Sequence, residues 1–203
     1  SIICNSGNAN TCNANGLEIA EQTCTLVADE LKITPEDVIV ASTGVIGQQM
    51  SIAPFRSGIP KLVAGLSTAG GSKAAEAIMT TDTVMKEVAV SFELDGKRCM
   101  LGGIAKGSGM IHPNMATMLV FITTDVAISP AMLQYALSID VQSSFNMVSI
   151  DGDTSTNDMV AVLANGMAGN TLIEQAGPAL DTFMAALNCV TVDLCKKIAA
   201  DGE

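Results

Sequence analysis

Apolar and polar residues follow one another along the chain in segments that predict helices and strands in alternation. Residues 17–31 carry apolar side chains at spacings of three and four, from Leu17 through Cys24 to Leu31, which is typical of an amphipathic helix. Further helices are expected at residues 70–80, 130–145 and 178–200, the last as one long helix or a pair, and strands at residues 1–4, 38–41, 88–94, 97–105, 117–122, 148–150 and 159–164. Strands that alternate with helices predict an α/β protein in which sheet and helices form packed layers.

Polar and glycine-rich segments predict where the strands end. The first strand should pass into a polar turn at residues 5–10, and the second should end at the Ser-Thr-Gly turn of residues 42–44. Residues 95–96, Asp-Gly, are a strong hairpin signal, so the strands on either side should pair antiparallel. A glycine-rich loop at residues 106–109 and a His-Pro-Asn turn at 112–114 come next. No repeat or linker is visible, so residues 1–203 are expected to form a single domain.

Composition and charge exclude several classes of protein. Aromatic residues make up 3% of the chain and there are 12 Met and no Trp, so small and flexible side chains must fill the core. The net charge of −11, without a basic cluster, argues against binding to nucleic acid or to an anionic membrane. No apolar run approaches the roughly 20 residues that span a bilayer. The six Cys form no C-x-x-C pair, so reduced thiols and a cytoplasmic location are expected.

One threonine is placed where an acyl-transfer nucleophile could act. The glycine-rich loop leads to Thr117 at the start of an apolar segment. A threonine hydroxyl needs a base, and the free α-amino group of an N-terminal threonine, with a reference pKa of about 7.7–8.0, can serve as one. Cleavage between Ala116 and Thr117 would create that amine. The sequence therefore predicts a chain that cuts itself before Thr117 and uses the freed residue for catalysis.

Other polar residues have plainer interpretations. Lys106 precedes its glycines, so the order of a nucleotide-binding P-loop is absent. His112 is the only histidine, and its place before a proline favours a turn over a catalytic relay. Asp151, Asp153 and Asp158 lack the glycine and the final glutamate of an EF-hand, which favours turn capping over metal binding.

Several motifs in order along the chain resemble one family, the ornithine acetyltransferases of arginine biosynthesis, also called glutamate N-acetyltransferases. The motifs are NSGNAN at 5–10, STGVIG at 42–47, IMTTD at 78–82, KGSGMIHPNMATML at 106–119, DGDTSTND at 151–158 and DGE at 201–203. The resemblance implies an α/β fold with sheets sandwiched between helical layers, the αββα arrangement shared with related aminopeptidases. Family members are longer at both ends, so the chain is expected to be a fragment.

The resemblance also implies roles for individual residues. Thr117 would be the nucleophile, and Thr43 and Gly44 would stabilise the oxyanion. The acyl substrate would be bound by Thr80 (with Thr81 as the less favoured register), Lys106, Thr117 and Glu203. Cleavage would leave residues 1–116 as the end of an α chain and residues 117–203 as the start of a β chain.

The reaction that the family carries out moves the acetyl group of N-acetylornithine to a threonine and then to glutamate, with no metal and no bound cofactor. Some members also accept acetyl-CoA, and the α and β chains assemble as two of each. Two alternatives stay open on the sequence. The first is an amidase or aminopeptidase on the same scaffold, in which water replaces glutamate. The second is a non-catalytic binding module in which Thr117 is a plain strand residue.

Overall fold

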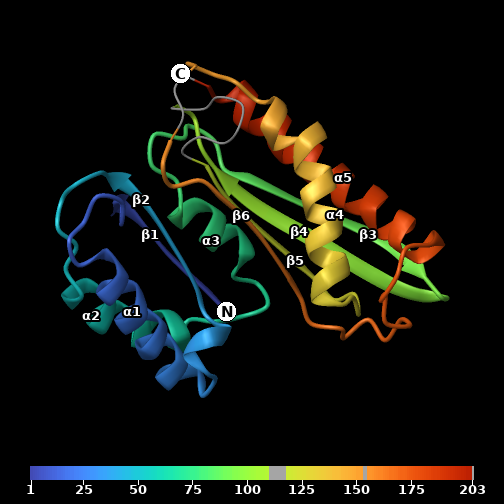
Figure 1. Cartoon of the computed structure of the whole chain (residues 1–203), viewed down its shortest axis with the longest axis horizontal. Helices are drawn as coiled ribbons and strands as arrows, with labels where there is room; N and C mark the ends of the chain where they lie inside the picture. Colours follow the sequence, from blue (N-terminus) through green and yellow to red (C-terminus); the bar gives the residue numbers. More distant parts are fainter. Residues whose placement is uncertain (110–117, 153–154, 203) are drawn as a thin grey trace. The chain divides into compact units, whose positions relative to one another are not determined.

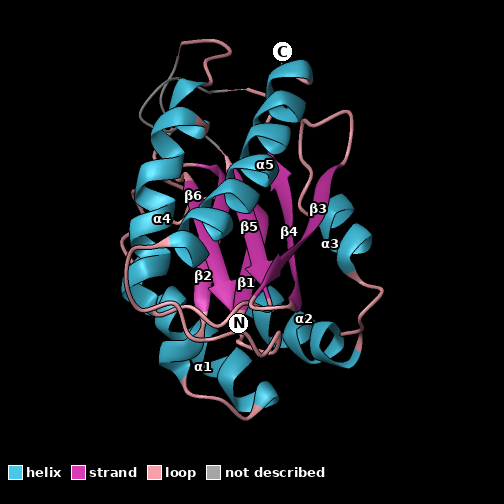
Figure 2. Cartoon of the chain, turned by 90° about the vertical axis from the view of Figure 1, so that its right-hand side faces the viewer, coloured by secondary structure: helices cyan, strands magenta, loops and turns pink. Residues whose placement is uncertain are grey.

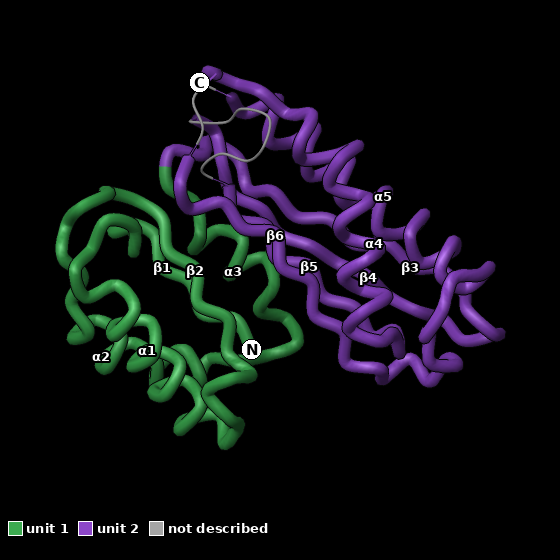
Figure 3. Tube along the Cα trace, viewed as in Figure 1, with its two compact units in different colours: residues 1–80 green, residues 81–203 purple. Residues whose placement is uncertain are grey.

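The computed structural model describes residues 1–109, 118–152 and 155–202 of the 203-residue chain (Figure 1). The elements are β1 (Ile2–Asn8), α1 (Gly16–Leu31), η1 (Pro35–Asp37), β2 (Ile39–Val45), α2 (Ala53–Ala64), α3 (Gly71–Ala77), β3 (Lys86–Leu94), β4 (Lys97–Lys106), β5 (Leu119–Thr124), α4 (Pro130–Ser143), η2 (Phe145–Met147), β6 (Met159–Ala164) and α5 (Pro178–Ala200). Helices and strands alternate along the chain, which confirms the predicted α/β class. The chain divides into two compact units, Ser1–Thr80 and Thr81–Glu203 (Figure 3), whereas the sequence pattern treats it as one.

Unit 1 is built on two parallel strands with helices packed against them. β1 pairs with β2 from Ile2↔Ile39 to Asn8↔Val45, and α1 packs against α2. Its small core contains Val27, Ala28, Val38 and Ile59, all less than 9% exposed. Leu17 opens the predicted apolar stripe but is 76% exposed, so the buried face of α1 lies toward Ile19, Thr23 and Val27 instead.

Both strands of unit 1 run further than their apolar residues indicate. β1 continues through the first four of the six residues of the predicted turn at 5–10, and β2 continues through residues 42–44, so the two predicted strand ends are wrong. The reason is that the polar segments pair with each other. The Ser42 hydroxyl donates to Asn5 Oδ1 at 2.6 Å, while the backbone ladder satisfies the peptide groups.

Unit 2 is a four-stranded sheet in the order β3-β4-β5-β6, with helices on one face (Figure 2). β4 runs antiparallel to both β3 and β5, whereas β5 and β6 are parallel. α5 packs across β3 and β4, and α4 packs against α5. The side of α5 that faces the core buries apolar residues at helical spacing, namely Leu180, Phe183, Leu187, Val190, Leu194 and Ile198. α5 is one continuous helix over the range predicted as one helix or two.

The hairpin and the last strand of unit 2 are confirmed as predicted. Asp95 and Gly96 have φ values of 53° and 70°, the left-handed pair that a tight hairpin needs. The predicted strand at 148–150 is wrong. Val148 and Ile150 pack their side chains against the core, but their backbone has no neighbouring strand to pair with. β5 begins at Leu119, and the predicted strand start at Thr117 lies outside the described residues.

Two further observations concern the whole described chain. All six cysteines are free, as predicted, and Cys99 and Cys195 are buried. No helix in the described part of the chain is long and apolar enough to cross a membrane.

Candidate active site

The strand register of unit 2 gathers polar residues at one end of its sheet. Lys86 at the start of β3 lies opposite Ala105, next to Lys106 at the end of β4. Lys106 pairs with Leu119 at the start of β5, and Leu119 pairs in turn with Met159 of β6. The glycine-rich loop, Met118 before β5 and Asp158 before β6 therefore all lie at this end of the sheet.

Asp158, which directly precedes β6, contacts the backbone just after the predicted nucleophile. Its Oδ1 accepts a hydrogen bond from the amide of Met118 at 2.6 Å. Its Oδ2 is buried and has no hydrogen-bond partner among the described residues. Burial raises the pKa of Asp158 to about 6, although the Met118 amide and the positive charge of Lys106 oppose the shift. The sequence predicted a capping role for this residue, and the capped group is the amide of Met118.

A buried ion cluster lies beside the glycine-rich loop. Lys86 Nζ is 2.6 Å from Asp82 Oδ1 and 2.5 Å from Asp201 Oδ2, and all three side chains are at most 2% exposed. Asp82 Oδ1 also accepts from the amide of Gly107 at 2.7 Å. Asp201 accepts from both the amide and the hydroxyl of Thr83. Burial alone would raise the pKa of Asp201, but the hydrogen bonds from Lys86 and Thr83 outweigh it and lower the pKa to about 2.

The predicted substrate lysine and the two candidate threonines are in different surroundings. Lys106 is 3% exposed, and its charge acts on Asp158. The hydroxyls of Thr81 and Ser108 lie 2.6 Å apart, so Thr81 is tied to the glycine-rich loop. Thr80, at the end of unit 1, and Thr81 are both exposed, and the choice between the two registers stays a prediction.

The predicted oxyanion residues lie in β2 of unit 1, inside the strand and not in a turn after it. Thr43 is 1% exposed, and no described residue bonds to its Oγ1. Gly44 has a φ of +125°, and a Cβ at this position would lie 2.3 Å from the carbonyl carbon of Gly7. A buried hydroxyl without a partner is a free donor for a negatively charged ligand atom. Gly44 is required by the close approach of β1, whatever else it does.

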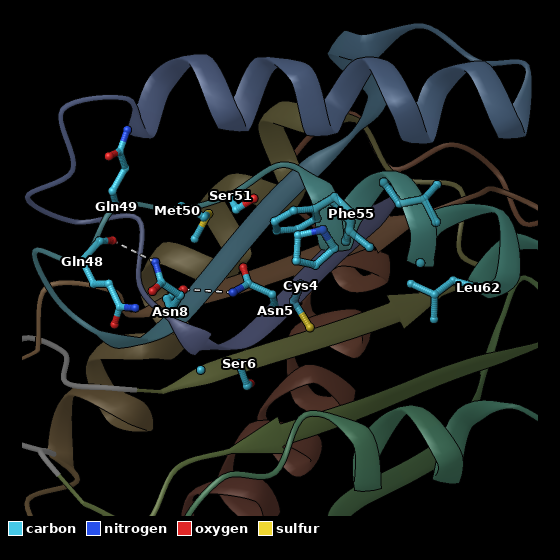
Figure 4. Close-up of a pocket in the computed structure, with 15 residues that line it drawn as sticks. Cys4, Asn5, Ser6, Asn8, Gln48, Gln49, Met50, Ser51, Phe55 and Leu62 are labelled. Atoms are coloured by element: carbon cyan, nitrogen blue, oxygen red, sulfur yellow. Dashed lines mark hydrogen bonds between the residues drawn. The ribbon is translucent and has the colours of Figure 1, made fainter.

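A separate pocket of about 480 Å³ lies in unit 1 between β1, residues 48–51 and α2 (Figure 4). Its polar side is the NSGNAN motif. Asn5 Nδ2 donates to the Asn8 carbonyl at 2.9 Å, and Asn8 Nδ2 donates to the Gln48 carbonyl at 3.0 Å, as the dashed lines show. Phe55 and Leu62 line the opposite, apolar side. No predicted site residue lines the pocket, and these two asparagines hold the backbone of the loop around it.

Some predicted residues lie outside the described part of the chain, namely His112, Ala116, Thr117 and Glu203. Of the others, Thr43, Gly44 and Thr80 belong to unit 1 and Lys106 to unit 2. Sequence reasoning missed the roles of Asp82, Lys86 and Asp201. Asp82 and Asp201 stand inside quoted motifs, and the spacing of Lys86 four residues after Asp82 was the available signal. Within the described residues, no group of three or more His, Cys, Asp or Glu could hold a metal ion.

Comparison with known proteins relates the whole chain to one family. The sequence model of the ArgJ family matches residues 1–203. The arginine biosynthesis bifunctional protein ArgJ of Synechococcus sp. is 50% identical over 203 residues, which are 100% of this chain and 49% of that protein. The chain spans about half the length of the curated relatives it matches.

Solved structures agree on the fold. The crystal structure of the arginine biosynthesis bifunctional protein ArgJ from Bacillus halodurans aligns with a TM-score of 0.51 and 41% identity, over 57% of this chain and 61% of that one. The L-aminopeptidase D-Ala-esterase/amidase of Ochrobactrum anthropi, a variant of the Ntn-hydrolase fold, aligns with a TM-score of 0.54 over 94% of this chain and 64% of that one. At 13% identity the second likeness concerns the fold alone. The expected α/β fold, with its likeness to the fold of an aminopeptidase, is confirmed.

Proposed function

The chain belongs to the ArgJ family, and on this premise we propose that the full-length protein transfers the acetyl group of N-acetylornithine to glutamate in arginine biosynthesis. The observation that carries the proposal is the match of the family over all 203 residues, with every quoted motif inside it. The chain would contribute the self-cleavage point between Ala116 and Thr117, the nucleophile and part of the substrate site.

The chemistry begins with Thr117. Its hydroxyl attacks the Ala116 carbonyl, and the peptide C–N bond breaks, which frees the amine of Thr117 and leaves an ester. Hydrolysis of that ester then releases the Thr117 hydroxyl and the Ala116 carboxylate. The amine then takes the hydroxyl proton as Thr117 attacks the acetyl carbonyl of N-acetylornithine. Ornithine leaves with a proton on its amine, and the acetyl-threonine ester remains. The amine of glutamate attacks that ester, which yields N-acetylglutamate and restores Thr117.

Thr43 and Gly44 are proposed to stabilise the negative oxygen that forms when Thr117 attacks the acetyl group of N-acetylornithine and again when glutamate attacks the acetyl-threonine ester. The buried hydroxyl of Thr43, which no described residue bonds, supports this assignment. A donor that is already fixed and dry needs no reorganisation when the charge develops. Gly44 can contribute only its backbone amide.

The amino-acid part of the substrate carries a carboxylate and an ammonium group. Lys106 is proposed to bind the carboxylate and Glu203 the ammonium, with Thr80 as a hydrogen-bonding partner. The buried position of Lys106 at the end of β4 supports its part, because a charge in a low-dielectric site interacts strongly with an ionic substrate.

Further features are proposed for the full-length protein from the family alone. Acetyl-CoA would serve as a second acetyl donor, in keeping with the bifunctional relatives. The α and β chains would assemble as two of each. The location would be cytoplasmic.

The test compares Thr117→Ser with Thr117→Ala in the full-length protein. Serine keeps the hydroxyl and the amine, so Thr117→Ser should cut itself and keep some acetyl transfer, whereas Thr117→Ala should stay whole and form no acetyl-enzyme. Intact mass spectrometry after incubation with N-acetylornithine measures both the cut and the added acetyl group. An alanine variant that is cut and acetylated like the parent would exclude Thr117 as the nucleophile. Release of free acetate without transfer to glutamate would favour the amidase alternative.

A further inference from the structure

The buried ion cluster of Asp82, Lys86 and Asp201 joins three of the motif segments through one side chain. Asp82 ends the IMTTD motif, and Asp201 begins the DGE motif. Both carboxylates bond Lys86 Nζ. The third segment, KGSG, enters through the amide of Gly107, which donates to the oxygen of Asp82 that Lys86 also bonds.

These contacts fix the backbone beside Lys106 and at the C-terminal end of α5. Gly107 directly follows Lys106, and its φ of +149° is a backbone conformation that residues other than glycine rarely adopt. Asp201 precedes Glu203 by two residues and anchors the chain just after α5. A Cβ on Gly202, which follows Asp201, would lie 3.1 Å from two side-chain carbons of Ile150, so Ile150 would have to shift to admit a side chain there.

Lys86 itself cannot touch a substrate, because its side chain is fully buried and both of its ionic partners are protein carboxylates. Burying three charges is costly, and well-packed apolar residues often serve stability equally well. A buried ion cluster is therefore weak evidence for stability alone, while its geometry restricts where the attached backbone can lie.

We propose that Lys86 is a positioning residue for amino-acid substrates, which holds the Lys106 loop and the C-terminal end of α5 at a fixed separation through Asp82 and Asp201. The proposal rests on the proposed function, since Lys106 and Glu203 are the residues expected to bind the substrate's two charges. Loss of the link should weaken substrate binding while the chemistry on Thr117 continues.

The experiment uses the full-length protein and three variants. Removing Lys86 alone would strand two buried carboxylates, so the main variant is Asp82→Asn/Lys86→Met/Asp201→Asn. It removes all three charges but keeps the acceptor oxygens for Gly107 and Thr83. Lys86→Arg keeps the positive charge and should retain most of the parent's substrate binding. Lys197→Met is the control, because Lys197 forms a half-exposed ion pair with Asp193 on α5.

The expected result is a separation of KM from kcat. The triple variant should cut itself and form acetyl-enzyme, with the KM for N-acetylornithine raised by about tenfold or more and kcat changed less than about threefold. The control should show the parent's KM, and Lys86→Arg should lie between the parent and the triple variant. If the triple variant does not fold, Asp201→Asn alone must raise KM in the same way.

A folded triple or Asp201→Asn variant with the parent's KM would overturn the proposal. The proposal would also be overturned if activity fell only in proportion to the amount of folded protein while KM stayed constant. Failure of the proposed function would look different, because the unmodified protein would then neither cut itself nor transfer acetyl.

Discussion

At the scale of single residues, the hydroxyl of Thr43 stands out because it is buried and no described residue forms a hydrogen bond with it. Leaving such a group unpaired costs about 1–3 kcal/mol, so a residue kept there for stability alone should not carry one. The same position in β2 could hold a valine of almost equal shape. The unpaired hydroxyl therefore does not serve stability, and it favours a role for Thr43 in binding an oxyanion.

The variant Thr43→Val distinguishes an effect of this hydroxyl on stability from an effect on catalysis. Stability should be unchanged or slightly higher, while kcat should fall by about 10²–10³-fold, the usual effect of removing one oxyanion donor. Thr23→Val is the matched control, because the Thr23 hydroxyl is also buried but donates to the Ile19 carbonyl at 2.7 Å. The control should lose about 0.5–1.5 kcal/mol of stability and keep its activity. Melting curves and steady-state kinetics on both variants check the result, and full activity in Thr43→Val would remove Thr43 from the oxyanion site.

Asp158 leads to a prediction about pH. Its pKa is raised by burial to about 6 in the folded protein, so the folded state binds this proton more tightly than the unfolded state does. The resulting stability is fully present below pH ~4, the ordinary range of an aspartate, and is lost as the pH rises through about 6.

Asp158→Asn removes this titration. The urea midpoint of the parent, compared with that of the variant, should therefore fall between pH 4 and pH 7. Urea unfolding of both proteins at several pH values measures the difference. Parallel pH profiles would show that Asp158 does not titrate as its surroundings indicate.

At the scale of elements, two adjacent glycines of β4 face different surroundings. A Cβ on Gly103 would lie 3.1–3.2 Å from side-chain carbons of Ile122, Val190 and Leu194, all fully buried. A Cβ on Gly102 would make only ordinary contacts, at 3.5 Å or more. Gly103 thus lets α5 lie close against the sheet.

Gly103→Ala should therefore destabilise the protein by about 1–3 kcal/mol, because none of the three neighbours has free space to move into. Gly102→Ala, on the same strand, should change stability little. Urea unfolding of the two variants is the measurement. Equal stabilities would mean that α5 can shift away from β4 at little cost.

The elements also show which sequence signals are sufficient. The Asp95-Gly96 turn and the range of α5 depend on local chemistry, and both are predicted from the sequence, the latter as one helix or two. α2 was not predicted, since Gly58 and Pro60 interrupt its helical pattern and only packing against α1 compensates. The ends of β1 and β2 depend on pairing between residues 37 apart, as Asn5 and Ser42 show, and no local pattern records that.

The candidate site follows the same rule. The motifs identify Thr43, Lys106 and Thr117 one by one, because family resemblance assigns roles to positions. The cluster around Lys86 and the contact of Asp158 with Met118 depend on the strand register, which brings distant segments to one end of a sheet.

At the scale of the whole molecule, the two compact units do not correspond to the two predicted chains. The division between units lies at Thr80, whereas the predicted cut lies at Ala116–Thr117, inside unit 2. Unit 2 would therefore be assembled from both predicted chains. The residues before the predicted cut would supply β3 and β4, and those after it would supply β5, β6, α4 and α5.

The backbone pairing between β4 and β5 would therefore also hold the two predicted chains together. Six residue pairs, from Leu101↔Thr124 to Lys106↔Leu119, would join one product of the cut to the other, and α5 would cover strands that belong to its partner. Lys86 and Asp201 would become an ion pair between two polypeptides. The cut would therefore release nothing, and it would convert a folded domain into an obligate heterodimer whose interface is the former hydrophobic core.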